Sequence, residues 1–123
     1  MRKKLNLEKV MVMEKNNKLD WNVLCMDYIL NEEVIEKYQD KVNWIFISKY
    51  QKLPETFIIK YQNKVSWYNI FKYQNLSENF IEKYKNKLDW NFVSRYQKLN
   101  KKFINKYSKY LNWNYITKFQ KYN

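Results

Sequence analysis

The stretch WIFISKYQKLPETFIIKYQNKVS, residues 44–66, is followed directly by WYNIFKYQNLSENFIEKYKNKLD, residues 67–89, and the two align without a gap. Tryptophan opens both, and the chain's five tryptophans are 23 residues apart: Trp21, Trp44, Trp67, Trp90 and Trp113. A fixed period of this length indicates one supersecondary unit copied in tandem. The repeats occupy residues 21–43, 44–66, 67–89 and 90–112, with half repeats at 7–20 and 113–123.

Each repeat predicts two short helices. A good N-cap stands directly before every tryptophan: Asp20, Asn43, Ser66, Asp89 and Asn112. Hydrophobic residues then recur at a spacing of three, as in Trp44, Ile47 and Tyr50, which places them on one side of a helix. A second start signal precedes each Phe-Ile-x-x-Tyr type of segment: Asn31, Pro54, Ser77 and Asn100. Just after this second helix we expect a left-handed residue, at Asp40, Asn63 and Asn86.

These helices are too short to be stable alone, because isolated helices below about 12 residues are marginal in water. Stacking would bury the Trp, Ile, Leu, Phe and Tyr of successive repeats as continuous ladders. The alternation that is typical of strands is missing. The sequence therefore predicts an all-α fold, an α-solenoid of five tandem 23-residue two-helix repeats with about ten short helices. Residues 1–123 are expected to form a single repeat domain, with Trp67 its most buried tryptophan.

The composition argues against catalysis. Histidine and glycine are absent, so the commonest general base and a glycine-rich phosphate loop are both missing. Cys25 is the sole cysteine and is expected to be a small buried apolar group. The acidic cluster Glu32, Glu33 and Glu36 is more typical of a solvated helix face than of a cation site. We therefore expect a protein that is not an enzyme and that has no cofactor and no metal site.

The first ten residues, MRKKLNLEKV, contain Glu8 and Lys9, which interrupt any apolar run. Neither a signal peptide nor a membrane span fits this pattern. A lone cysteine also means that the fold does not depend on an oxidising compartment. The expected location is cytoplasmic, inside the host cell, and no membrane partner is expected.

The net charge of +12 is unevenly distributed. Residues 1–62 contain eleven Lys and Arg against nine Asp and Glu, whereas residues 63–123 contain thirteen against three. Lysines and arginine also recur at fixed repeat positions, as in Lys49, Lys72, Arg95 and Lys118; this ladder is interpreted as a solvated face. A denser group is the candidate binding surface for a partner: Lys83, Lys85, Lys87, Arg95, Lys98, Lys101, Lys102, Lys106 and Lys109. An AT-rich coding sequence would also produce many lysines, and that alternative stays open.

The segments WIFISKYQKL, residues 44–53, and LSENFIEKYKNKLDW, residues 76–90, resemble short tandem helical repeats encoded by large DNA viruses and some phages. The resemblance extends from Leu7 to Asn123. It implies a viral or mobile-element origin and a role as an inhibitor of a host factor, including a nuclease defence complex. The first repeat departs from the pattern, since residues 25–28 read CMDY where the next repeat has SKYQ.

Two functions follow as hypotheses. The first is a non-enzymatic binding module, encoded by a virus or phage, that engages a host protein or ribonucleoprotein through protein–protein interaction. The alternative is sequence-nonspecific binding of RNA or DNA by the basic C-terminal half. A purely structural viral component is a third reading. The sequence leaves open the identity of the partner, the solenoid face that binds and the oligomeric state.

Overall fold

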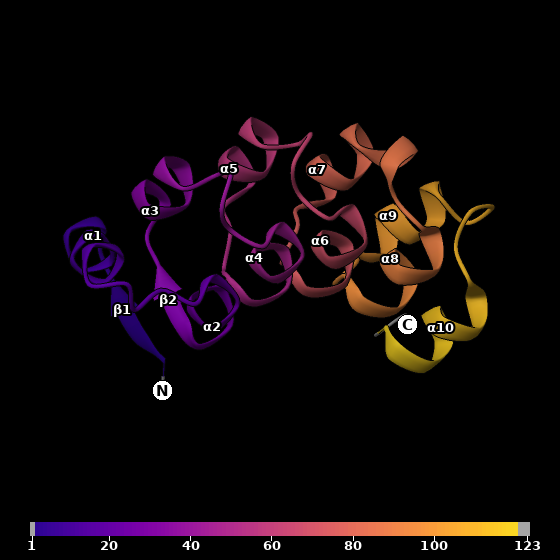
Figure 1. Cartoon of the computed structure of the whole chain (residues 1–123). Coiled ribbons are helices and arrows are strands. Elements are labelled where there is room, and N and C mark those ends of the chain that lie inside the picture. The colour runs from indigo at the N-terminus through magenta and orange to yellow at the C-terminus, as the bar shows by residue number, and fades with distance from the viewer. Residues whose placement is uncertain (1, 121–123) are drawn as a thin grey trace. The chain divides into compact units, whose positions relative to one another are not determined.

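The computed structural model describes residues 2–120, which form ten α-helices, one short 3-10 turn and two three-residue strands (Figure 1). The prediction of an all-α fold is therefore confirmed for this part of the chain. The two strands were not predicted. The chain divides into two compact units, Met1–Val65 and Ser66–Asn123, and each is described by itself.

The first compact unit contains α1 (Leu7–Lys15), α2 (Trp21–Asp27), α3 (Glu32–Lys37), α4 (Trp44–Tyr50) and α5 (Glu55–Lys60). Its strands are β1 (Lys3–Leu5) and β2 (Tyr28–Leu30), which pair in parallel with Lys3 opposite Tyr28. Helix α2 packs beside α4, and α1 packs beside α3. The tryptophan-led helices of successive repeats thus lie next to one another.

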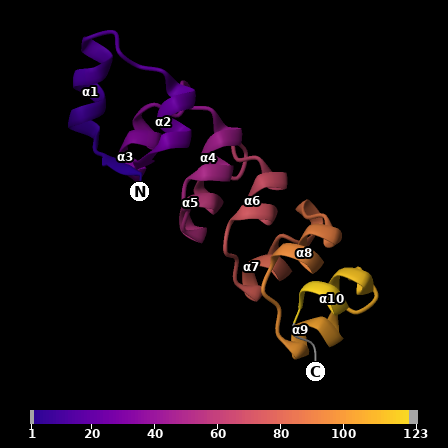
Figure 2. The same ribbon diagram turned by 90° about the horizontal axis from the view of Figure 1, so that it is seen from below.

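The second compact unit contains α6 (Trp67–Tyr73), α7 (Glu78–Lys83), the 3-10 turn η1 (Lys85–Lys87), α8 (Trp90–Tyr96), α9 (Lys101–Lys106) and α10 (Trp113–Phe119). Helix α8 packs between its two counterparts in sequence, α6 and α10. In Figure 2 these three helices lie one after another along the same side of the unit. The 23-residue period therefore places equivalent side chains of α6, α8 and α10 on one face.

The predicted helix starts are confirmed. Four of the five caps before the tryptophans accept a backbone N–H with their side chain: Asp20, Asn43, Asp89 and Asn112. Asn31, Ser77 and Asn100 do the same for the second helices. Pro54 is the N-cap of α5 rather than its first helical residue, and Ser66 makes no such bond to the α6 backbone.

The left-handed residue predicted after each second helix is wrong, whereas the first helices end at Gln51, Gln74, Gln97 and Gln120, as their pattern predicts. Asn17, with φ of 53°, has the only positive φ among the described residues, so Asp40, Asn63 and Asn86 are not left-handed. The reason is that the chain runs on through another turn after the second helix. After α3, for example, the amides of Lys41 and Val42 both donate to the carbonyl of Tyr38. These turn hydrogen bonds satisfy the end of the helix without a left-handed residue.

The core combines aliphatic residues at the fourth position of each tryptophan-led helix with Phe-Ile pairs of the second helices, such as Phe57 and Ile58. Ile47, Ile70 and Ile116 are fully buried at the fourth position. The tryptophans were expected to be buried and are not: Trp21, Trp44, Trp67 and Trp90 are partly exposed, and Trp113 is 39% exposed. Three residues advance a helix by about 300°. The first and seventh positions of the helix therefore flank the fourth on either side, and their rings lie at the margins of the core.

Buried glutamines join neighbouring repeats within each unit. Gln97 donates to the carbonyls of Phe71 and Gln74, at 2.8 and 2.9 Å, and accepts from the amide of Leu76 at 3.2 Å. Gln51 makes the corresponding bonds to the carbonyls of Cys25 and Tyr28 and the amide of Leu30. Each glutamine thereby satisfies three backbone groups of the preceding repeat.

The first repeat has Tyr28 where later repeats have glutamine. There β1 pairs with β2 instead, so backbone hydrogen bonds replace the side chain. This exchange explains why a strand pair occurs at this point of an otherwise helical chain.

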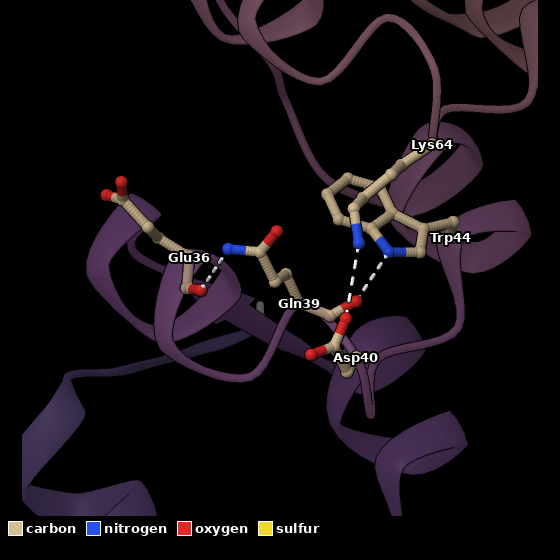
Figure 3. A network of polar contacts seen from close by, with 5 residues as sticks. All are labelled: Glu36, Gln39, Asp40, Trp44 and Lys64. Carbon is tan, nitrogen blue, oxygen red and sulfur yellow. Dashed lines mark hydrogen bonds and ion pairs between the residues drawn. The ribbon is translucent and has the colours of Figure 1, made fainter.

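The turn after α3 is tied to the next repeat by polar contacts (Figure 3). Trp44 donates its indole N–H to the carbonyl of Gln39 at 2.8 Å, and the Gln39 amide donates to the carbonyl of Glu36. Lys64 forms an ion pair with Asp40 at 3.2 Å. The tryptophan therefore has a polar role at the core margin as well as an apolar one.

Candidate binding surface of the second compact unit

All nine residues of the candidate basic surface are exposed, but they lie in different places. Lys83, Lys85 and Lys87 lie at the end of α7 and in η1. Lys101, Lys102 and Lys106 belong to α9, with Lys98 before it and Lys109 after it. Arg95 belongs to α8, on the tryptophan-led side of the unit. The structure thus separates Arg95 from the α9 lysines.

The three carboxylates of this unit are engaged by the fold. Glu78 accepts from the amide of Asn100 at 2.8 Å, and Asp89 caps α8 through the amide of Asn91 at 2.8 Å. Glu82 forms an ion pair with Lys106 at 2.8 Å. The unit contains twelve Lys and Arg against these three acids, so its surface keeps a large positive charge.

The Glu82–Lys106 pair shifts both groups toward their charged forms. The hydrogen bond from Lys106 is the largest cause of the lowered pKa of Glu82, and the bond from Tyr107 adds to it. The same bond to Glu82 raises the pKa of Lys106. Because both groups are exposed, the pair stabilises the fold only modestly. Its bond to Glu82 also makes Lys106 less available to a partner than the neighbouring lysines are.

Arg95 lies among three rings. Its Cζ is 5.0 Å from the ring centroid of Tyr96, 4.9 Å from that of Phe119 and 5.7 Å from that of Tyr115. Since Tyr96 is on α8 and the other two rings are on α10, the guanidinium bridges neighbouring helices. A cation at these distances is attracted by the ring quadrupole.

Lys72 repeats this arrangement one helix earlier. Its Nζ is 5.7 Å from the centroid of Tyr68, 5.3 Å from that of Tyr73 and 5.6 Å from that of Tyr96. Hydrogen bonding with Tyr73 is the largest cause of the raised pKa of Lys72. The lysine thereby bridges α6 and α8 as Arg95 bridges α8 and α10.

The rings around these cations remain accessible. Tyr68 is 55% exposed, Tyr96 38% and Phe119 43%. Phe92 contacts the ring of Tyr68 edge-on, with centroids 4.7 Å apart. We call this surface the first-helix face of the second unit, and it comprises Tyr68, Lys72, Tyr73, Phe92, Arg95, Tyr96, Tyr115, Lys118 and Phe119. The sequences of α6, α8 and α10 contain no carboxylate.

Sequence reasoning found only part of this face. Arg95 was among the candidate residues, whereas Lys72 and Lys118 were interpreted as a solvated ladder and the rings as core. The signal was present as a cation and an aromatic residue that recur side by side every 23 residues, as in Lys72–Tyr73 and Arg95–Tyr96.

The residue types present would allow two further kinds of site, a reactive thiol and a metal centre. Cys25 is buried, and its burial raises the pKa of the thiol, which keeps it protonated and unreactive. Within residues 2–120, no three Cys, Asp or Glu side chains gather closely enough to hold a metal ion. A hollow of about 310 Å³ beside α9 is lined by Glu82, Lys85, Trp90, Lys106 and Tyr110, among others.

Comparison of the chain with protein-family models, curated proteins and solved structures gives no match. Among the described helices, none combines the length and apolar character that crossing a membrane requires. The surface chemistry itself is therefore the basis for assigning a function.

Proposed function

We propose that the protein is a non-enzymatic binding module, encoded by a virus or phage, that engages a host protein or ribonucleoprotein in the host cytoplasm. The observation that carries the proposal is the exposed positive surface of the second compact unit, whose three acids are all engaged by the fold. Such a surface attracts an acidic partner and accelerates its association. In its narrower form, the proposal makes the protein an inhibitor of a host defence nuclease complex.

The repeats support this proposal, because stacked copies of one unit present an extended surface on which a large partner can bind. The glutamine bonds recur at the same spacing in both compact units, from Gln51 to Tyr28 and from Gln97 to Gln74. We infer from this recurrence that the five tandem repeats form an α-solenoid. Within each unit, the offset of 23 residues means that the preceding repeat is bonded to the following one in the same way.

The test is affinity capture from host lysate with a variant of the basic surface. Lys98, Lys102 and Lys109 are each replaced by Gln, and a matched control carries Gln at Lys9, Lys15 and Lys52, which are exposed in the first unit. Exposed substitutions change stability by no more than about 0.5 kcal/mol each, so both variants should fold. We expect the first variant to lose the captured partner and the control to keep it, with or without nuclease treatment. A partner that both variants retain equally would contradict the proposal.

A second candidate function is sequence-nonspecific RNA or DNA binding, and the rings and cations of the first-helix face favour it. Aromatic rings stack bases while basic groups contact phosphates. In this case nuclease treatment removes every captured partner, and affinity for the purified nucleic acid falls steeply as salt is raised.

A further inference from the structure

We infer that the first-helix face of the second unit binds single-stranded nucleic acid, with bases stacked on the rings of α6, α8 and α10 and with Lys72 and Arg95 near the phosphates. This inference rests on the second candidate function. It adds where the nucleic acid binds, that the nucleic acid is single-stranded, and how its nucleotides are spaced on the protein. It concerns a different surface from the lysines of α9.

The face supplies the two components that single strands require. Ring faces tolerate any base, and fixed cations follow the backbone. Here the cations are held by rings on two sides: Arg95 contacts Tyr96 and Phe119, and Lys72 contacts Tyr68 and Tyr96. Because these side chains are already positioned, binding costs less conformational entropy.

The spacing favours a single strand over a duplex. Neighbouring packed helices are separated by about 8–10 Å, whereas stacked bases of a duplex rise by about 3.4 Å per strand position. A duplex therefore cannot place successive bases on successive helices. An unstacked single strand can stretch to this spacing, and helical-repeat proteins that bind RNA read one base per repeat. We expect one nucleotide per 23-residue repeat on this face.

The same chemistry favours nucleic acid over an acidic protein. An acidic peptide would neutralise the cations, whereas a nucleic acid would also offer a planar base to each of the four rings that are 38–55% exposed: Tyr68, Tyr73, Tyr96 and Phe119. No carboxylate occurs within α6, α8 or α10, and the one beside Tyr68 and Phe92, Asp89, accepts the amide of Asn91 as the N-cap of α8.

The experiment measures fluorescence anisotropy of a labelled oligothymidylate and a labelled oligouridylate, each of about 12 nucleotides, at low salt. A duplex with the same number of phosphates and an oligoglutamate peptide are the competing probes. We expect the single strands to bind at least about tenfold more tightly than the duplex once phosphates are matched. A preference for the duplex or for the peptide would overturn the inference.

Matched variants locate the site. Lys72→Gln is compared with Lys9→Gln, an identical change at an exposed position of α1. Tyr96→Leu is compared with Tyr110→Leu, because Tyr110 is 61% exposed and lies outside the first-helix face. We expect the face variants to weaken binding about tenfold and the controls about twofold or less. Tyr96→Phe keeps the ring and should bind like the parent, and a Tyr96→Leu variant that melts like the parent shows loss of stacking rather than loss of folding.

The outcomes distinguish this inference from the function on which it rests. If Lys72→Gln and Lys9→Gln weaken binding equally, affinity follows net charge alone; nonspecific nucleic-acid binding then stands and the stacking site is wrong. If the parent protein binds no nucleic acid at low salt, both are wrong. Capture of a host protein that survives nuclease treatment would leave the first proposed function intact.

Discussion

At the scale of single residues, buried polar side chains as well as tryptophans connect neighbouring repeats within a unit. Gln97 is 3% exposed and satisfies three backbone groups of the preceding repeat. The sequence shows this glutamine at a fixed position, but its three partners lie 21–26 residues away. Local sequence patterns describe which residues are neighbours on one helix. They therefore could not predict hydrogen bonds between one repeat and the next.

Gln97→Leu should therefore be strongly destabilising. Leucine fills a similar space but leaves two carbonyls and one amide buried without partners, each of which costs about 1–3 kcal/mol. We expect the free energy of unfolding to fall by about 3 kcal/mol in urea denaturation. Gln39→Leu is the control, because Gln39 donates only to the carbonyl of Glu36; it should lose about 0.5 kcal/mol. Equal losses would show that the bonds between repeats do not stabilise the fold.

Trp67→Ala tests the tryptophan ring at the core margin. The ring of Trp67 stacks on Tyr84 and Phe80, with centroids 5.5 and 6.2 Å away, and is partly exposed. We expect a loss of about 3 kcal/mol, the low end for deleting a large aromatic side chain. Trp113→Ala should lose less, because Trp113 is 39% exposed. A larger loss at Trp113, measured by the same thermal melts, would contradict this view of burial.

At the scale of helices and strands, the sequence predicted where helices begin better than it predicted the backbone conformation that follows the second helices. A cap such as Asp89 accepts from an amide only two or three residues away. The short stretch of sequence around the cap is therefore enough to predict where the helix begins. The conformation after a second helix depends on turn hydrogen bonds that asparagine does not specify, so the left-handed conformation predicted for Asn63 and Asn86 was wrong. Strand β1 escaped notice because Lys3–Leu5 is too short for an alternating pattern.

The cap of α8 gives a sharp test at this scale. Asp89→Ala should lower the free energy of unfolding by about 1 kcal/mol, because the amide of Asn91 loses its acceptor. Asp89→Asn removes the same charge but keeps an acceptor, as Asn43 and Asn112 do at the same repeat position. It should therefore melt close to the parent temperature. If both substitutions lower the melting temperature equally, charge rather than capping explains the loss.

At the scale of the whole molecule, the sequence shows the excess of positive charge and its uneven distribution along the chain. It did not predict the surface on which basic side chains lie against aromatic rings. Composition locates cations along the chain, whereas the contact of Arg95 with Phe119 depends on α8 packing beside α10. The tryptophan-led helix also suggested that every ring on the same side was core. The angular spread of positions one, four and seven shows why the seventh, as in Tyr96, is exposed.

We also expect charge to affect the stability of the fold in acid, though only modestly because the carboxyls concerned are exposed. Hydrogen bonds from lysines of neighbouring segments are the largest cause of the lowered pKa of three carboxyls: Glu14, Glu36 and Glu82. A carboxyl whose pKa is lower in the folded chain stabilises the fold fully above its ordinary value of 4.5. That stabilisation is lost as the pH falls through the lowered value, because protonation breaks the pair.

We therefore expect the melting temperature to fall between about pH 5 and pH 2, with added repulsion from the net charge of +12 as carboxylates are neutralised. A triple variant with Gln at Glu14, Glu36 and Glu82 should melt lower than the parent at pH 6 and should change less over this range. A control with Gln at the exposed Glu8, Glu32 and Glu33 loses the same charge but should keep the acid dependence of the parent. The measurement is the melting temperature at each pH, followed by circular dichroism. If the melting temperatures of the two triple variants fall in parallel with pH, net charge rather than the three ion pairs causes the acid sensitivity.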